Sequence, residues 1–272
     1  MRRENLTLLA LLLPAGAFFA AFFLLPLARL FLVGASGKGG FANYATIITD
    51  RNHFASLLAT LALAAATTIV TLIISGIAGV FLQRNKFRGN AALVAMLTLP
   101  LAFPGVVIGF MVIVLAGRQG LIGDISQALT GEKIVFAYSM AGLFMGYVYF
   151  SIPRTILTVM ATAEKLDPRL EEAARSLGAS PWRVTRDVII PGLKPAFIST
   201  GAICFATAMG AFGTAFTLAT RINVLPMVIY TEFTLEANIA AAAALSFVLG
   251  AVTWIVLAVA RTAAGGTVAA AG

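Results

Sequence analysis

Six long apolar stretches, separated by shorter polar segments, organise this chain. They cover 6–33, 55–82, 91–116, 134–160, 196–220 and 239–260. A membrane-spanning helix needs about 20 consecutive, mostly apolar residues, and each stretch reaches that length. The pattern therefore predicts an all-α membrane protein with six transmembrane helices. The expected divisions are an N-terminal segment with the first helix (1–40), a transmembrane domain (41–262) and a disordered tail (263–272).

The polar segment 164–195, between the fourth and fifth stretches, has the local chemistry of two short helices. Each predicted helix begins with an N-cap residue followed by proline, a typical helix start: Asp167-Pro168 and Ser180-Pro181. Gly178 lies between them and suits the positive φ that ends a helix. We expect Pro191 and Pro195 to break the second helix before the fifth span begins.

The spacing within this segment resembles a known motif. Three residues separate Glu172-Ala173-Ala174 from Gly178, and nine residues separate Gly178 from Val188-x-Ile190-Pro191. This resembles the EAA loop of binding-protein-dependent ABC importer permeases, whose pattern is EAA-x3-G-x9-I-x-LP. The chain departs from it only by Val188 and Ile190. The resemblance implies a type I ABC importer permease fold with cytoplasmic coupling helices, in which the loop docks on a separate ATPase.

The residues that the resemblance assigns to ATPase coupling are Glu171, Glu172, Ala173, Ala174, Arg175, Gly178, Ala179, Ser180, Pro181 and Pro191. The small side chains of Ala173 and Ala174 would let a partner approach closely, and Glu172 would supply a charge. Arg175, Arg183 and Arg186 could contact either the partner or lipid headgroups. The alternative is an ordinary amphipathic interfacial loop that binds only lipid.

Composition agrees with a membrane protein. The 272 residues are 60% hydrophobic and 11% charged, whereas soluble domains are nearer half apolar and a quarter charged. Of the 19 Lys and Arg residues, 12 fall at the ends and in segments that are inside if the N-terminus is cytoplasmic, and 6 fall outside. This bias favours cytoplasmic termini and a cytoplasmic EAA loop. The remaining residue, Arg154, is near the predicted inner end of the fourth stretch, where snorkelling to headgroups would explain it.

The N-terminal apolar run is interpreted as a retained first span. Arg2 and Arg3 precede it, as in a signal peptide, but the run is too long for a signal core.

Residues for catalysis are sparse. His53 is the one histidine and Cys204 the one cysteine, and the sequence has no G-x-x-x-x-G-K-[ST] phosphate loop. We therefore expect no catalytic residue, no metal site and no cofactor in this chain, with ATP and Mg held by a partner ATPase. No acidic residue lies deep in a predicted span, which disfavours a proton-coupled carrier.

The fifth stretch is unusually rich in small and polar residues between 206 and 217, which indicates either tight packing or a solvated path. Candidate residues of a translocation path are Tyr147, Phe150, Ser151, Gly210, Phe212, Thr214 and Glu232.

The substrate is the least determined feature. The segments 213–216 and 224–232 look like those of spermidine/putrescine permeases, a group that also resembles importers of iron(III), aminoethylphosphonate, thiamine and sulfate. Acidic residues expected on the outer side favour a cation such as a polyamine, although they could equally be solvated loop charges: Asp124, Glu132, Glu232 and Glu236.

The resulting prediction is a permease subunit in a bacterial inner membrane. Its expected partners are an ATPase dimer, a second permease subunit (a heterodimer being favoured), and a periplasmic or lipid-anchored solute-binding protein. The alternatives are a carrier or channel that works alone, and a membrane enzyme.

Overall fold

The computed structural model describes residues 2–37, 39–218 and 222–263, with side chains from Leu11 onward. This described part is helical and contains no strand. Its α-helices are α1 (Arg2–Phe19), α2 (Leu25–Gly34), α3 (Ala42–Thr49), α4 (Arg51–Arg84), α5 (Asn90–Thr98), α6 (Gly105–Ala116), α7 (Leu121–Thr130), α8 (Met140–Lys165), α9 (Pro168–Ser176), α10 (Pro181–Val184), α11 (Ile190–Met209), α12 (Gly213–Leu218), α13 (Leu225–Tyr230) and α14 (Ile239–Ala263). Shorter helical turns of π or 3₁₀ type are η1 (Ala20–Leu24), η2 (Leu99–Ala102), η3 (Thr185–Ile189) and η4 (Thr231–Leu235). Of the predicted disordered tail, Ala263 ends α14, and 264–272 lie outside the described residues.

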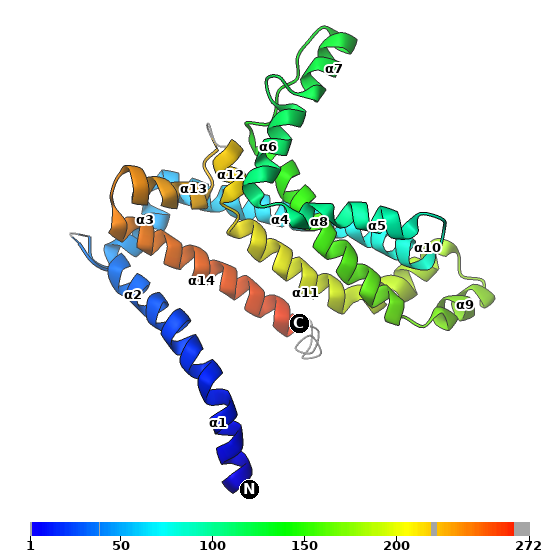
Figure 1. The fold of residues 1–272 in the computed structure, drawn as a ribbon, viewed down its shortest axis with the longest axis horizontal. Coiled ribbons are helices and arrows are strands. Elements are labelled where there is room, and N and C mark those ends of the chain that lie inside the picture. The colour runs from blue at the N-terminus through cyan, green and yellow to red at the C-terminus, as the bar shows by residue number, and fades with distance from the viewer. Residues whose placement is uncertain (1, 38, 219–221, 264–272) are drawn as a thin grey trace. The chain divides into compact units, whose positions relative to one another are not determined.

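Six helical segments of the described residues are long and apolar enough to cross a membrane (Figure 1). They are Leu11–Gly34, Arg51–Arg84, Gly105–Thr130, Met140–Lys165, Pro181–Met209 and Ile239–Thr262. The predicted all-α class and the predicted number of spans are confirmed.

The third span differs from the prediction of 91–116. The helix that begins at Asn90 ends at Thr98, and a 3₁₀ turn containing Pro100 leads to an extended residue, Phe103, before Pro104. Proline lacks the backbone N–H of a helical bond and disfavours helical geometry in the residue before it. The long apolar segment therefore starts again at Gly105 and continues through α6 and α7.

The expected break at Pro191 and Pro195 is wrong. The fifth candidate span runs from Pro181 to Met209 without interruption. A wide π-type turn, in which the Ile190 N–H bonds to the Thr185 carbonyl, directly precedes Pro191. Such a turn changes the bonding register of a helix, so the missing N–H of proline is accommodated. The helix also ends at Met209, before the predicted 220, and a short helix, α12, follows from Gly213.

The chain forms two compact units, which are described separately: Leu58–Met227 with Val252–Gly272, and Met1–Leu57 with Val228–Ala251. In the first, α8 is central and contacts α5, α6, α11 and α12. The packing between these helices is close at two glycines. A Cβ atom added at Gly146 would lie 2.9 Å from Cγ2 of Thr214, and one at Gly109 would lie 2.6 Å from Cβ of Thr217. Small residues at such contacts let membrane helices approach closely.

In the second unit, aromatic and polar contacts tie α2, α3 and the start of α14 together. The hydroxyl of Tyr44 donates to the carbonyl of Phe31 at 2.6 Å, and the amide of Asn43 donates to the carbonyl of Gly34 at 3.0 Å. The ring of Phe31 lies 5.1 Å from that of Phe247. These contacts pair the end of the first span with the beginning of the last.

Candidate functional site

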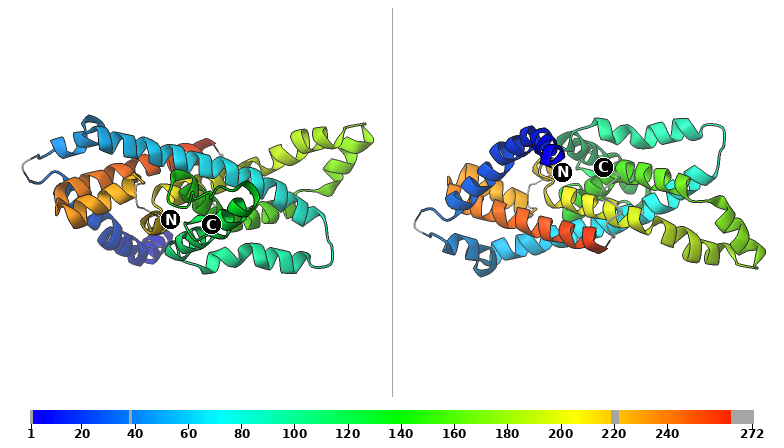
Figure 2. Two further views of the ribbon diagram at one scale, coloured as in Figure 1. Left: turned by 90° about the horizontal axis from the view of Figure 1, so that it is seen from above. Right: turned by 90° about the horizontal axis from the view of Figure 1, so that it is seen from below.

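The EAA loop, residues 164–195, has the predicted helix–turn–helix form at its centre. The Asp167 side chain accepts from the N–H of Arg169 at 2.9 Å, and the Ser180 side chain accepts from the N–H of Arg183 at 3.4 Å. Both predicted N-caps are confirmed. Figure 2 shows α9 and α10 at one end of α8 and α11 in both views.

Gly178 ends α9 with φ +83°. Its N–H bonds to the Arg175 carbonyl at 2.9 Å, and the N–H of Ala179 bonds to the Ala174 carbonyl at 3.0 Å. This is the Schellman arrangement, in which a left-handed residue lets the chain reverse and satisfies the last helix carbonyls. The predicted role of Gly178 as a helix stop is confirmed.

One face of the loop packs on the chain itself. A buried cluster of apolar side chains joins α8 to the segment that follows α9: Val159, Ala163, Val184, Ile189 and Leu193. Ala174 and Ala179 pack against this cluster. Ala174 and Ala179 are thus half-buried, with one side packed on the chain's own core, and their role in ATPase coupling stays a prediction.

Large apolar side chains of the loop are exposed. Leu177 is 88% exposed and Trp182 is 68% exposed. Exposed large apolar side chains beside charges are typical of protein or membrane interaction sites. Neither residue is among the predicted coupling residues. The predicted coupling residues that are exposed are Glu172, Ala173, Arg175, Gly178, Ser180, Pro181 and Pro191.

Glu171 differs from its neighbour Glu172 because it is buried. A carboxylate oxygen of Glu171 lies 2.6 Å from the Nη2 atom of Arg84, the last residue of α4, and its other oxygen lies 3.5 Å from Arg175. Arg84 also donates to the carbonyl of Leu166 at 3.4 Å. In the sequence, Arg84 served only as a topology signal, because 87 positions separate it from Glu171.

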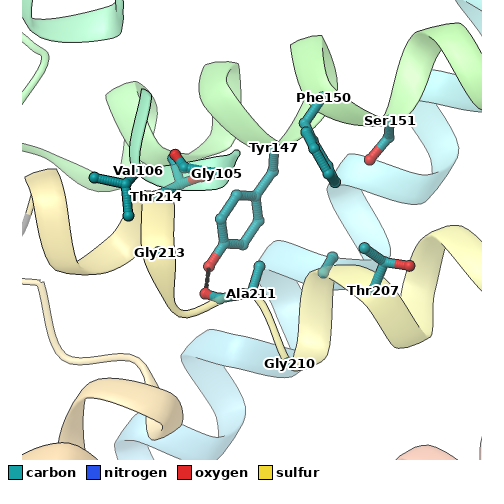
Figure 3. Close-up of a pocket in the computed structure, with 11 residues that line it drawn as sticks. Gly105, Val106, Tyr147, Phe150, Ser151, Thr207, Gly210, Ala211, Gly213 and Thr214 are labelled. Carbon is teal, nitrogen blue, oxygen red and sulfur yellow. Dashed lines mark hydrogen bonds between the residues drawn. The ribbon is translucent and has the colours of Figure 1, made fainter. Parts of the chain in front are cut away.

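A cavity of about 280 Å³, lined mostly by apolar atoms with a few hydroxyl groups, lies between α8, the start of α6, and the segment that joins α11 to α12 (Figure 3). Its lining residues are Gly105, Val106, Tyr147, Phe150, Ser151, Thr207, Ala208, Gly210, Ala211, Gly213 and Thr214. It brings together five of the seven predicted path residues, whereas Phe212 and Glu232 are not in its lining. Pockets for drug-sized ligands typically measure about 300–1,000 Å³, so a small solute would fit here.

Two of the polar groups in this cavity are held by hydrogen bonds across it. The Tyr147 hydroxyl donates to the carbonyl of Ala211 at 2.5 Å (Figure 3), and the Thr214 hydroxyl donates to the carbonyl of Gly105 at 2.9 Å. The described lining contains hydroxyl and backbone groups but no charged side chain. Its chemistry suits a solute that is recognised by hydrogen bonds.

A smaller hollow adjoins this cavity and shares Phe150, Ser151 and Thr207 with it. The residues that it adds are Arg154, Thr155, Thr200 and Cys204. Because α8 runs from Met140 to Lys165, its midpoint falls between Ile152 and Pro153, and Arg154 lies close to it. The helix continues five residues beyond the predicted end of the fourth stretch at 160, so Arg154 lies 11 residues before the end of α8.

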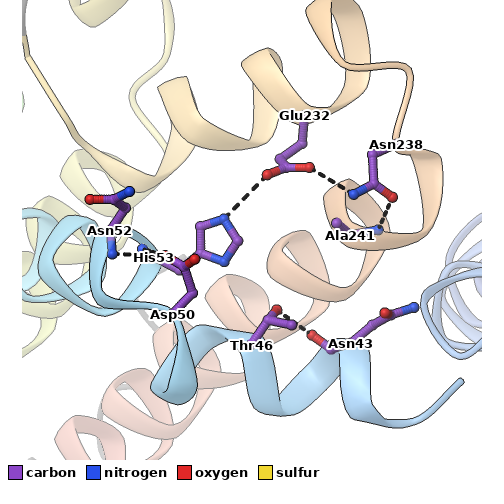
Figure 4. A network of polar contacts seen from close by, with 8 residues as sticks. All are labelled: Asn43, Thr46, Asp50, Asn52, His53, Glu232, Asn238 and Ala241. Carbon is purple, nitrogen blue, oxygen red and sulfur yellow. Dashed lines mark hydrogen bonds and ion pairs between the residues drawn. The ribbon is translucent and has the colours of Figure 1, made fainter. Parts of the chain in front are cut away.

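Glu232 belongs to a separate network of polar contacts in the unit that contains α3 (Figure 4). One of its oxygens lies 3.2 Å from Nε2 of His53, and the other accepts from the Asn238 amide at 3.0 Å. Backbone N–H groups of His53 and Asn52 donate to the Asp50 carboxylate and hold its pKa below the ordinary value. Glu232 is thus a buried, bonded residue in this structure.

The described residues contain no cluster of three or more His, Cys, Asp or Glu side chains that could bind a metal ion.

Solved structures with a similar fold come from an importer of polysaccharide. A chain of a bacterial alginate ABC transporter, in complex with an alginate-bound periplasmic protein, superimposes with a TM-score of 0.79 at 16% identity, covering 96% of this chain and 94% of that chain. At this identity the match supports the fold alone, and it confirms the type I permease fold.

Curated relatives are permeases with several named substrates. Sulfate permease 2 of Chlamydomonas reinhardtii is 30% identical over 89% of this chain and 66% of its own length. Molybdenum transport system permease ModB of Escherichia coli is 35% identical over 55% of this chain and 66% of its own. A putative 2-aminoethylphosphonate permease, PhnU of Salmonella typhi, is 28% identical over 85% of this chain and 82% of its own. The chain thus spans just under two thirds of the length of the first two.

The match to a protein family covers most of the chain. The model for binding-protein-dependent transport system inner membrane components matches residues 72–264. These residues include α8, the EAA loop, and the helices α11 and α12 that line the cavity. The chain therefore belongs to the family of binding-protein-dependent transport system inner membrane components.

Proposed function

We propose that this chain is the membrane-spanning, non-catalytic subunit of an ABC importer that carries a small oxyanion across a bacterial inner membrane. The observation that carries the proposal is the two-sided EAA loop, which packs Ala174 and Ala179 on the chain's own core and exposes Leu177 and Trp182. The exposed side is the docking surface for an ATPase dimer, which holds ATP and Mg. Both termini and the loop lie in the cytoplasm, as the Lys and Arg distribution favours.

Coupling follows from the attachment of the loop. The segment from Pro181 to Met209 is one continuous candidate span, so α10 is directly joined to α11. Movement of a docked ATPase would therefore be transmitted to α11 without a flexible linker. Because α11 provides Thr207 and Ala208 to the cavity wall, closure of the ATPase dimer would change the cavity.

An oxyanion is the substrate that the chemistry favours. The substrates named for the three curated relatives are sulfate, molybdenum and 2-aminoethylphosphonate. The described cavity lining offers hydroxyl groups and no carboxylate, whereas a polyamine would need acidic partners. The predicted polyamine is therefore our second candidate, supported only by sequence segments and by acidic residues outside this cavity.

Two further partners complete the proposed importer. Alternating access requires a second permease subunit, and a heterodimer remains our expectation. A solute-binding protein, periplasmic or lipid-anchored, would deliver the substrate from outside. If this binding protein supplies much of the selectivity, related permeases can be named for different substrates.

The test is uptake together with co-purification. The tagged chain is expressed, together with its native partner subunits, in cells that lack their own sulfate and molybdate importers. Uptake of radiolabelled sulfate, molybdate and putrescine is measured, and the subunits that co-purify with the tag are identified. We expect oxyanion uptake and recovery of an ATPase.

Two results would change this proposal in different ways. Uptake of putrescine without any oxyanion uptake would replace the substrate class but leave the importer. Uptake of a solute by the chain alone, with no ATPase bound, would instead establish a stand-alone carrier or channel.

A further inference from the structure

Arg154 lies in the middle of the fourth span, where a charge is unusual. α8 has 26 residues, and Arg154 is 11 residues before Lys165 at its end. With a rise of about 1.5 Å per residue, it is roughly 16 Å along the axis from that end. The hydrocarbon core of a bilayer is about 30 Å thick. Arg154 therefore lies about halfway along the fourth candidate span, away from the charged residues at its end.

No carboxylate of the described residues forms an ion pair with this guanidinium. The one acidic residue of α8 is Glu164, ten positions after Arg154, and α11 has none between Ile190 and Met209. The hollow that Arg154 lines is otherwise neutral, with hydroxyl groups from Ser151, Thr155, Thr200 and Thr207. An ionisable residue inside a membrane usually faces a partner or a polar path.

The hollow that Arg154 lines shares residues with the larger cavity. Ser151 lies one helical turn before Arg154 and lines both the cavity and the hollow. Its hydroxyl makes no hydrogen bond within the described part of the chain, whereas those of Thr155 and Thr207 donate to helix carbonyls. Ser151, whose hydroxyl is a free donor, thus lines both spaces, and Arg154 lines the hollow that adjoins the cavity.

From these observations we infer that Arg154 and Ser151 form a transient binding site for the oxyanion within the translocation path. The inference rests on the proposed function. The planar guanidinium presents paired N–H donors that match two oxygens of a sulfate-like or phosphonate-like group. The Ser151 hydroxyl binds a third oxygen. An anion passing through the cavity thereby balances the positive charge of Arg154, with which no carboxylate of the described residues forms an ion pair.

A different role is open to Arg154 in the assembled importer. The side chain is exposed on the isolated chain, so a carboxylate from the second permease subunit could pair with it instead. In that case its loss would weaken subunit assembly rather than anion transport. The experiment is designed to separate these two roles.

The variants are Arg154→Gln, which removes the charge, and Arg154→Lys, which keeps the charge but loses the paired donors. Arg88→Gln is the matched control, because Arg88 is an exposed arginine in the turn between α4 and α5. Each is expressed with the native partner subunits. Initial rates of radiolabelled sulfate and molybdate uptake are measured across concentrations, with the abundance of the chain in the membrane and the co-purified subunits.

We expect Arg154→Gln to lower oxyanion uptake at least tenfold with unchanged abundance and unchanged partner subunits. Arg154→Lys should raise the KM several-fold and lower the maximal rate less than Arg154→Gln does, because a single ammonium charge replaces the paired N–H donors of the guanidinium. Arg88→Gln should transport as the wild type does. If Arg154→Gln accumulates poorly, the KM of Arg154→Lys decides the matter.

Three results would overturn the inference. Wild-type oxyanion uptake by Arg154→Gln would refute it while leaving the proposed function intact, and so would an unchanged KM in Arg154→Lys. Loss of the second permease subunit from the purified complex of Arg154→Gln would assign the residue to assembly. If the wild-type importer carries no oxyanion, the proposed substrate class itself has failed.

Discussion

The guanidinium of Arg84, at the end of α4, lies 2.6 Å from the carboxylate of Glu171 in α9. The two side chains are 22% and 11% exposed, so the ion pair is largely shielded from water. It ties the end of the second span to α9, the helix that precedes the exposed Leu177 and Trp182. The ion pair thus gives the docking surface a fixed position relative to the helices that it is proposed to move.

Removing Arg84 should loosen the EAA loop. In Arg84→Ala, Glu171 keeps only the contact with Arg175, at 3.5 Å. Loss of one partner of a buried ion pair costs on the order of 3 kcal/mol, which here falls on the docking of α9. We expect substrate uptake and the amount of co-purified ATPase to fall several-fold, as measured in cells and on the purified complex.

The control for this prediction is Lys133→Ala, which breaks an ion pair outside the EAA loop. Lys133 pairs with Asp124 at 2.8 Å, with the two side chains 34% and 62% exposed, and exposed ion pairs contribute about 0–1 kcal/mol, so uptake should change little. The exchanged pair Arg84→Glu with Glu171→Arg should recover part of the activity. Wild-type uptake in Arg84→Ala would show that the pair does not position the loop.

Gly178 offers a test of the loop against a glycine of the same geometry. Gly178 and Gly131 both follow a helix, with φ +83° and +76°, and a Cβ atom would meet nothing within 4 Å at either. Valine at each position should therefore cost a similar amount, about 1–2 kcal/mol of backbone strain. Only Gly178 lies on the proposed docking side.

We expect Gly178→Val to abolish most ATPase-dependent uptake and Gly131→Val to retain it, with similar membrane abundance for both variants. Uptake assays paired with immunoblots of the membrane fraction would measure this. Equal uptake by the two variants would argue that the turn after α9 has no coupling role.

Tyr147 should hold the cavity wall through its hydroxyl group. The hydrogen bond to the Ala211 carbonyl fixes the chain just after α11, and Tyr147→Phe would leave that carbonyl without this donor. We expect a loss of about 1–2 kcal/mol in stability, and a melting temperature lower by a few degrees. Tyr149→Phe is the control, because the Tyr149 side chain is 41% exposed. An unchanged melting temperature for Tyr147→Phe would show that the bond adds nothing to stability.

Local signals in the sequence were sufficient for the spans and for the centre of the EAA loop. Apolar length identified six spans, and the Asp167, Gly178 and Ser180 positions gave the caps and the turn because those effects act within one helical turn. The continuity through Pro191 was missed, because a π-type turn depends on the bonding register of the whole helix. Proline alone indicated a break.

Contacts between segments far apart in the chain could not be predicted from the sequence. The Arg84–Glu171 pair and the exposure of Trp182 depend on how α4, α8 and α9 pack, and no periodic pattern records that. The predicted path residues Tyr147, Ser151 and Thr214 do line one cavity. They could be identified because small and polar residues in an apolar span mark an interior face. Whether those residues form the path stays a prediction.

The acidic residues that were grouped together on the outer side differ in the structure, and this separates their expected effects. Glu232 is buried and bonded to His53 and Asn238, whereas the Glu236 side chain is exposed. In Glu232→Ala, the His53 ring and the Asn238 amide both lose a partner, at a cost on the order of 2 kcal/mol. We expect a melting temperature lower by several degrees for Glu232→Ala and no shift for Glu236→Ala, measured on the purified importer. If uptake falls in Glu232→Ala while the melting temperature is unchanged, Glu232 contacts the substrate rather than holding the network, and its predicted place in the path would be restored.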